Sequence, residues 1–149
     1  MDQLLDRLWV GDRRDADDLL AAPVPVIEYV MNLSQFAPVP SPQVFSLWYP
    51  MDDEVFLPAL MWDAVTGFIG SVLSSNLRLL VHCRLGKSRS PAACAAYLIR
   101  CGYAPVDALD MVRACRAIAD PHQETWRSVL AWAHTRFGYR PYTWEPARA

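Results

Sequence analysis

The chain has 149 residues, 53% of them hydrophobic, which suits a single domain with one core. Its formal net charge of −2 excludes a strong overall attraction to nucleic acid or to an anionic membrane, so any recognition of anions must be local. The four cysteines form no C-x-x-C pair, which favours reduced thiols over a disulfide framework. There is no signal-peptide pattern, and no apolar run reaches the roughly 18 residues of a membrane span. We therefore expect a soluble, cytoplasmic protein.

The first third of the chain alternates short strands with one helix. Apolar and β-branched runs predict the strands, and a proline closes the helix. Three prolines in six residues predict an extended loop after the second strand. We expect strands at 8–11, 24–33 and 44–50, a helix at 14–22 and the proline-rich loop at 37–42.

The rest of the chain is mainly helical, with one apolar strand in the middle. We expect a strand at 77–81 and helices at 57–75, 90–100, 105–115 and about 121–137. Strands separated by helices predict an α/β fold: one domain with a central, mainly parallel sheet flanked by helices. We expect the domain to span residues 1–138, followed at 139–149 by a C-terminal tail with too much proline for a helix.

One stretch, from His82 to Ser90, combines a cysteine, an arginine and a short turn rich in backbone N–H groups. The five residues between Cys83 and Arg89 are enough to wrap a loop around a tetrahedral dianion, and the guanidinium can grip two of its oxygens. A predicted strand precedes the loop and a predicted helix follows it. We therefore expect a phosphate-binding loop with Cys83 at its floor, where ligands of parallel sheets bind. The substrate-binding residues would be Arg84, Leu85, Gly86, Lys87 and Ser88.

The residue types in this loop suit nucleophilic chemistry at phosphorus. A helix N-terminus and a nearby arginine favour the thiolate form of a cysteine, which can attack in line and form a phosphocysteine. A carboxyl group from elsewhere must then act first as an acid and later as a base. Asp52 and Asp53 are the natural candidates, with Asp120 a weaker third. Ser90 can donate a hydrogen bond to the sulfur, or simply cap the helix.

The loop resembles the signature of the cysteine-dependent protein tyrosine phosphatases, in the form His82-Cys83-x-x-Gly86-x-x-Arg89-Ser90. Its surroundings are similar to the compact dual-specificity branch of that superfamily. That branch has an "L-x-L/V-G" strand, a "V-x-N-x-S" strand end and a proline three residues before the general acid. The matching segments here are 8–11, 30–34 and 50–53.

This resemblance implies roles for individual residues. It makes Cys83 the nucleophile, Arg89 the phosphate clamp, Asp53 the general acid and Ser90 a helper hydroxyl. It also implies that His82 and Asn32 support the loop. The sequence departs from the family at Leu85, where a small residue is more common, and at 116–119, where Arg-Ala-Ile-Ala replaces "R-P-x-I".

Several other interpretations remain open from the sequence. We expect no metal and no cofactor, because His82, His122 and His134 lack partners at metal-binding spacing. We interpret Cys94, Cys101 and Cys115 as small buried residues, although any of them could be a redox partner of Cys83.

The expected substrate is a phosphorylated protein carrying phosphotyrosine, with phosphoserine and phosphothreonine as further candidates. Arg84 and Lys87 would also suit a phosphoinositide. A rhodanese-like sulfurtransferase and a non-catalytic phosphate-binding module are rivals from other classes. Nucleotide binding is disfavoured because Val81 stands where a Walker A loop needs glycine. We expect no nucleic-acid or membrane partner, and the sequence leaves the oligomeric state undetermined.

Overall fold

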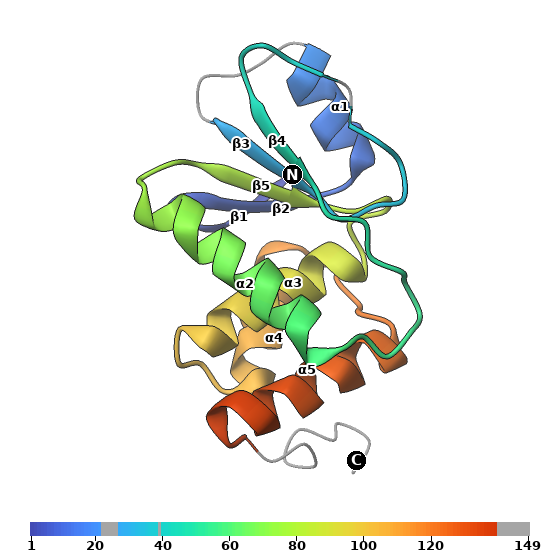
Figure 1. Ribbon diagram of the computed structural model, residues 1–149, viewed down its shortest axis with the longest axis vertical. Coiled ribbons are helices and arrows are strands. Elements are labelled where there is room, and N and C mark those ends of the chain that lie inside the picture. Colours follow the sequence, from blue (N-terminus) through green and yellow to red (C-terminus); the bar gives the residue numbers. More distant parts are fainter. Residues whose placement is uncertain (22–26, 39, 140–149) are drawn as a thin grey trace.

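The computed structural model describes residues 1–21, 27–38 and 40–139 (Figure 1). A five-stranded sheet runs in the order β1-β2-β5-β3-β4. The pairs β2/β5, β5/β3 and β3/β4 are parallel, whereas β1 joins antiparallel, to β2. The strands are β1 (Asp2–Leu5), β2 (Leu8–Gly11), β3 (Tyr29–Asn32), β4 (Phe45–Trp48) and β5 (Leu79–His82). This confirms the predicted α/β fold with a central, mainly parallel sheet.

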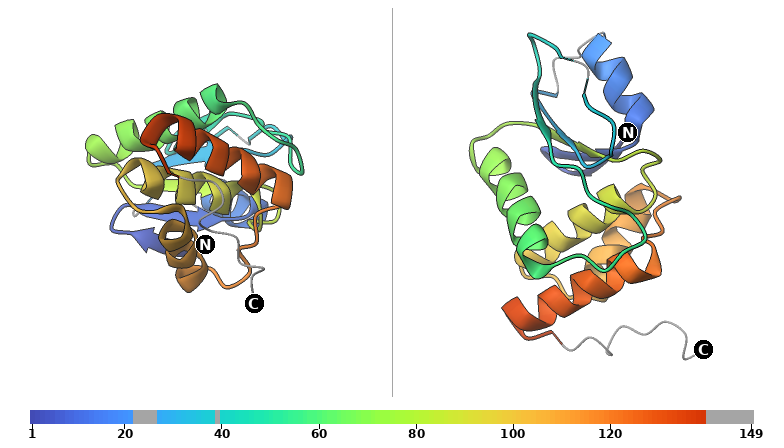
Figure 2. Two further views of the ribbon diagram at one scale, coloured as in Figure 1. Left: turned by 90° about the horizontal axis from the view of Figure 1, so that it is seen from below. Right: turned by 45° about the vertical axis from the view of Figure 1, so that its right-hand side comes forward.

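Five helices in the described part of the chain cover the two faces of the sheet unequally. One helix packs on one face and four pack on the other, as Figures 1 and 2 show. The single helix is α1 (Arg13–Ala21). The other four are α2 (Ala59–Ser74), α3 (Arg89–Arg100), α4 (Pro105–Cys115) and α5 (Gln123–Phe137).

Two hydrophobic clusters fill the space on the two faces, because successive strand residues point to opposite sides. Leu80 belongs to the smaller cluster under α1, while its neighbours Leu79 and Val81 belong to the larger one under α2 to α5. Helix α3 is central to the larger cluster, and its run Ala92–Ala96 is completely buried. These small side chains let α2, α4 and α5 pack around it, which fixes the start of α3 beside the sheet edge.

The strand register brings the loops that follow four strands to one edge. Gly11 and Asn32 flank His82 in adjacent strands, and Trp48 pairs with Asn32. These four residues end β2, β3, β5 and β4. The loops after them carry Asp12, Leu33, Cys83 and the acidic pair Asp52 and Asp53, so residues distant in sequence meet at the carboxyl edge of the sheet.

Most predicted elements lie within a few residues of their expected bounds, with some corrections. The strand β1 was not predicted. The strand expected at 24–33 is shorter, Tyr29–Asn32, and residues 24–26 lie outside the described part. The interpretation of three buried cysteines is wrong for Cys101, which is exposed; Cys94 is buried and Cys115 is half-buried.

Two further observations concern the helices and the C-terminal end of the described chain. No helix in the described ranges has the length and apolar character needed to cross a membrane. The last described residue, Tyr139, donates its hydroxyl hydrogen bond to the Gly102 carbonyl at 3.1 Å. The remainder of the predicted tail, 140–149, lies outside the described residues, so the boundary at 138 stays a prediction.

The smaller cluster should contribute strongly to stability because it attaches α1 to the sheet. Leu80→Ala removes a fully buried side chain from this cluster and should lower the free energy of unfolding by about 2–5 kcal/mol. The control Leu60→Ala truncates a leucine that is 73% exposed. This substitution should change the free energy of unfolding by no more than about 0.5 kcal/mol. Urea denaturation followed by circular dichroism measures both values. Equal effects would show that α1 is not held by this cluster.

Candidate active site

The loop between β5 and α3 is held from outside by hydrogen bonds to its carbonyl groups. The Arg13 amide donates to the Arg84 carbonyl at 3.2 Å, and the Asp120 amide donates to the Lys87 carbonyl at 2.7 Å. The Arg116 guanidinium donates through Nε to the Gly86 carbonyl at 2.6 Å. In a trans peptide the following N–H points away from the carbonyl. The amides of residues 85, 87 and 88 therefore point toward the inside of the loop, where an anion would sit.

Gly86 is required by this geometry for two reasons. Its φ of +65° lies in the left-handed region, where a side chain is unfavourable. A Cβ at this position would also meet the Arg116 guanidinium and lie 2.8 Å from the carbonyl carbon and oxygen of Gly11. The glycine thus allows both the turn and the close approach of β2.

Arg116 is a residue whose importance sequence reasoning missed. Its side chain is 7% exposed, yet it ties three separate segments together. Besides the Gly86 carbonyl, it contacts the Asp2 carboxylate at 2.8 Å and the Asp12 carboxylate at 3.9 Å. The only sequence signal was its position in the altered "R-P-x-I" segment, which said nothing of these partners.

Cys83 lies at the floor of the loop and is 2% exposed. Its Sγ is 3.3 Å from the Ser90 Oγ, and this hydroxyl also donates to the Gly11 carbonyl at 3.0 Å. With a neutral thiol, Ser90 can accept from sulfur while donating to Gly11. With a thiolate, the same hydroxyl proton can turn toward sulfur and stabilise its charge.

Arg89 is buried beside the cysteine and anchored by main-chain groups. Its Nη1 donates to the Met51 carbonyl at 3.0 Å and, more weakly, to the Leu33 carbonyl at 3.4 Å. Its Nε is a buried donor with no hydrogen-bond partner among the described residues. A buried donor of this kind calls for an explanation, and an oxyanion above Cys83 would supply the missing acceptor.

The two candidate acids point in different directions. The Asp53 Oδ1 accepts from the Ser88 hydroxyl at 2.7 Å and from the Glu54 amide at 2.9 Å. The exposed Asp52 instead accepts from the Gln35 side chain at 3.1 Å. Asp53 therefore faces the phosphate loop, while Asp52 lies against the loop after β3.

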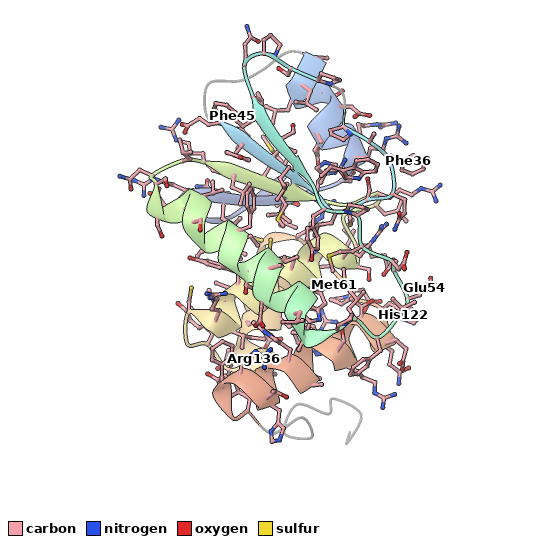
Figure 3. All side chains as sticks on the ribbon, in the orientation of Figure 1. Phe36, Phe45, Glu54, Met61, His122 and Arg136 are labelled. Carbon is pink, nitrogen blue, oxygen red and sulfur yellow. The ribbon has the colours of Figure 1, made fainter. Side chains whose placement is uncertain are left out.

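Ser88 links Asp53 to the beginning of α5. Its hydroxyl donates to Asp53 and accepts from the His122 amide at 2.9 Å. Although Ser88 occupies the N-cap position of α3, its side chain makes no capping hydrogen bond there. Figure 3 shows Glu54 and His122 on the same side of the molecule, consistent with this link.

His82 and Asn32 act on the surroundings of the loop. Burial lowers the pKa of His82 from its ordinary value of 6.5, which keeps the ring neutral, and its Nδ1 is 3.3 Å from the Cys83 carbonyl. Asn32 binds within its own loop: its amide donates to the Phe36 carbonyl at 2.7 Å and its oxygen accepts from the Ser34 hydroxyl at 2.6 Å. Asn32 thus shapes the segment whose Leu33 carbonyl accepts from Arg89.

These residues open into a cleft of about 1440 Å³. The sequence-predicted residues that line it are Asp53, Cys83, Arg84, Leu85, Lys87, Ser88 and Arg89. Asp120, the third acid candidate, also lines the cleft, but its carboxylate lies 3.5 Å from Arg113. A cysteine thiol, a buried guanidinium and a carboxylate therefore share one cavity, as a thiol-based phosphate-binding site requires.

A comparison with known protein families identifies the same class of protein as the sequence resemblance. Residues 8–135 match the family described as dual specificity phosphatase, catalytic domain. The chain belongs to this family, within the cysteine-dependent protein tyrosine phosphatase superfamily.

Individual relatives show the extent of the similarity. The chain is 32% identical over 123 residues to dual specificity protein phosphatase 2 of Mus musculus, covering 80% of this chain and 39% of that protein. It is 36% identical over 78 residues to dual specificity protein phosphatase 18 of Mus musculus, covering 52% and 42%. The chain thus spans about two fifths of the length of these relatives.

Solved structures agree over almost the whole chain. Human DUSP28 superposes with a TM-score of 0.79 at 25% identity, covering 91% of this chain and 96% of that chain. A mouse putative dual specificity phosphatase, solved in complex with zinc tungstate, superposes with a TM-score of 0.78 at 28% identity, covering 90% and 86%.

The turn at Gly86 should be essential for anion binding. Gly86→Ala forces a side chain into the left-handed region and against Arg116, so the affinity for inorganic phosphate should fall at least about tenfold. The control Gly70→Ala lies in α2, where the nearest atom to an added Cβ is Tyr97 Cε1 at 3.6 Å, and should leave the affinity unchanged. Isothermal titration calorimetry measures both. Full affinity in Gly86→Ala would contradict the inward-facing loop.

Proposed function

We propose that this chain is a cysteine-dependent phosphatase that hydrolyses phosphotyrosine, and also phosphoserine and phosphothreonine, through a phosphocysteine. The main evidence for this proposal is that Cys83, the unpartnered Nε of Arg89 and the inward-facing Asp53 meet in one cleft. The proposed catalytic residues are Cys83, Arg89, Asp53 and Ser90. The proposed catalytic domain is 1–138, followed by the tail.

In the first step a phosphate monoester binds to the loop amides and Arg89. The Cys83 thiolate attacks phosphorus in line, and the bond from phosphorus to the ester oxygen breaks. Asp53 gives its proton to the leaving oxygen. Because Oδ1 is held by Ser88 and Glu54, while no hydrogen bond from the described residues reaches Oδ2, we assign the transferred proton to Oδ2.

In the second step the Asp53 carboxylate takes a proton from a water molecule, which attacks the phosphocysteine. The bond from phosphorus to sulfur breaks, inorganic phosphate leaves, and the thiolate is restored. The hydroxyl of Ser90, 3.3 Å from Sγ, stabilises the departing thiolate. One carboxyl group thus serves as acid and then as base, and returns to its starting state.

The proposed substrate is a phosphorylated protein. The family and the relatives are named as dual specificity phosphatases, which favours this class over the phosphoinositide, sulfurtransferase and non-catalytic alternatives. The mouse structure was solved in complex with zinc tungstate, and tungstate is a tetrahedral oxyanion, which supports oxyanion binding by a protein of this fold. A cytoplasmic location is proposed from the four free cysteines.

The mechanism predicts different effects for the nucleophile and the two carboxylates. Cys83→Ser should abolish phosphate release. Asp53→Asn should lower kcat about 10²-fold or more on aryl phosphates with poor leaving groups and much less on good ones. Asp52→Asn is the matched control and should stay near wild type. Phosphate release is measured with chelator present on a series of aryl phosphates and on phosphotyrosine and phosphothreonine peptides.

Two results would contradict this assignment. Undiminished phosphate release by Cys83→Ser would end the phosphocysteine mechanism. If Asp52→Asn loses activity on poor leaving groups while Asp53→Asn keeps it, the general acid is Asp52.

Ser88 should be a positioning residue that acts through Asp53. Ser88→Ala removes the hydrogen bond to Oδ1, so kcat on poor leaving groups should fall about tenfold, with little change on good ones. Ser88→Thr retains a hydroxyl and should recover most of the loss. In an Asp53→Asn background, Ser88→Ala should lower kcat little further. A double-mutant cycle of kcat values measures this coupling. Equal losses in both backgrounds would mean that Ser88 acts independently of the acid.

A further inference from the structure

The cleft is larger than the phosphate-binding loop needs. Its volume of about 1440 Å³ exceeds the range of roughly 300–1,000 Å³ typical of small-molecule pockets. From Cys83 it continues along residues of α4 and α5, including Val106, Asp110 and Arg127. The space beyond the loop is therefore continuous with the site where the phosphoryl group would react, and can hold more of a substrate than its phosphorylated side chain.

The part beyond the phosphate has exposed apolar walls. Phe56, in the loop after β4 that carries Asp53, is 54% exposed. Val106 at the start of α4 is 46% exposed, and Leu85 in the loop after β5 is 63% exposed. All three line the cleft, and the buried side chains of Trp126 and Leu130 from α5 lie beneath. Exposed apolar side chains that gather at a cleft are typical of binding surfaces.

The charges along the same walls are already paired or negative. Arg113 lies 3.5 Å from Asp120, and Arg127 lies 3.0 Å from Glu124. The remaining charged side chains of the cleft outside 83–89 are Asp53, Glu54 and Asp110, all acidic. Among the described lining residues outside the loop, the arginines and lysines are Arg113 and Arg127, and each lies against a carboxylate. This distribution disfavours doubly phosphorylated and acidic sequences.

We propose that the cleft selects phosphopeptides with a large apolar residue within three positions of the phosphorylated residue. This proposal rests on the proposed phosphatase function and names its substrate class. The phosphoryl group occupies the loop, and the apolar side chain packs against Phe56 and Val106. Specificity then comes from apolar burial, since the loop amides contact only the group shared by all phosphate monoesters.

The test uses a set of phosphotyrosine peptides that differ from one another at a single flanking position. At each position from −3 to +3 in turn, the peptide carries leucine, serine, aspartate or phosphoserine. Wild type should show a kcat/KM about tenfold higher for leucine than for aspartate at one or more positions. Phe56→Ser and Val106→Ser should reduce that ratio toward one, with unchanged kcat/KM on a small aryl phosphate. The matched control is Phe45→Ser, a phenylalanine 67% exposed on the edge strand β4, far from His122 in Figure 3, which should keep the ratio.

Three results would overturn the proposal: no preference for leucine, a preference for aspartate or phosphoserine, or an equal loss of the ratio in Phe45→Ser. Faster hydrolysis of a phosphoinositide in vesicles than of every peptide would also overturn it, in favour of a lipid substrate. The affinities of the same peptides for Cys83→Ser, measured by calorimetry, separate this proposal from the catalytic one. A tenfold leucine preference in binding supports the cleft even if wild type releases no phosphate, a result that would refute only the proposed function.

Discussion

Three hydrogen bonds on the outer side of the loop after β5 determine which backbone groups its inner side presents to an anion. The donors are the amides of Arg13 and Asp120 and the guanidinium of Arg116, which come from the start of α1 and from the segment between α4 and α5. They hold the carbonyls outward, so the protein's own contacts make the amides converge on the centre of the loop. The loop therefore needs little reorganisation when negative charge develops on the phosphoryl group.

The parallel sheet explains why these parts of the chain meet. In a parallel sheet the carboxyl ends of all strands lie at one edge, so each strand followed by a helix delivers a loop to the same place. Gly11 and Asn32 flank His82 in the register, and Trp48 pairs with Asn32 on its other side. The loop after β2 supplies Asp12 to Arg116, the loop after β3 supplies the Leu33 carbonyl to Arg89, and the loop after β4 supplies Asp53. Cys83 itself needs only the end of β5 and the start of α3.

The sequence predicts the parts of this site that depend on local pattern. The strand, the phosphate loop and the following helix are contiguous, so the spacing of Cys83 and Arg89 was sufficient to locate them. The strand β1 was missed because its residues, Asp-Gln-Leu-Leu, form neither an apolar run nor an alternation of apolar and polar residues, and its pairing with β2 includes a register shift that no local pattern encodes. The roles of Arg116 and Ser88 depend on side-chain directions across 30 and 35 residues, respectively. The orientation of Asp53 toward the loop is likewise a property of three-dimensional packing.

In the proposed mechanism, Ser88 also connects the general acid to the walls of the cleft. Its hydroxyl accepts from the His122 amide at the start of α5, and donates to the carboxylate of Asp53. Helix α5 supplies Trp126 and Leu130 to the same cleft. The position of the acid and the packing of a substrate against α5 are therefore not independent. Contacts that fix the start of α5 also fix the Ser88 hydroxyl, so in the proposed mechanism binding energy from residues beside the phosphate would raise kcat as well as lower KM.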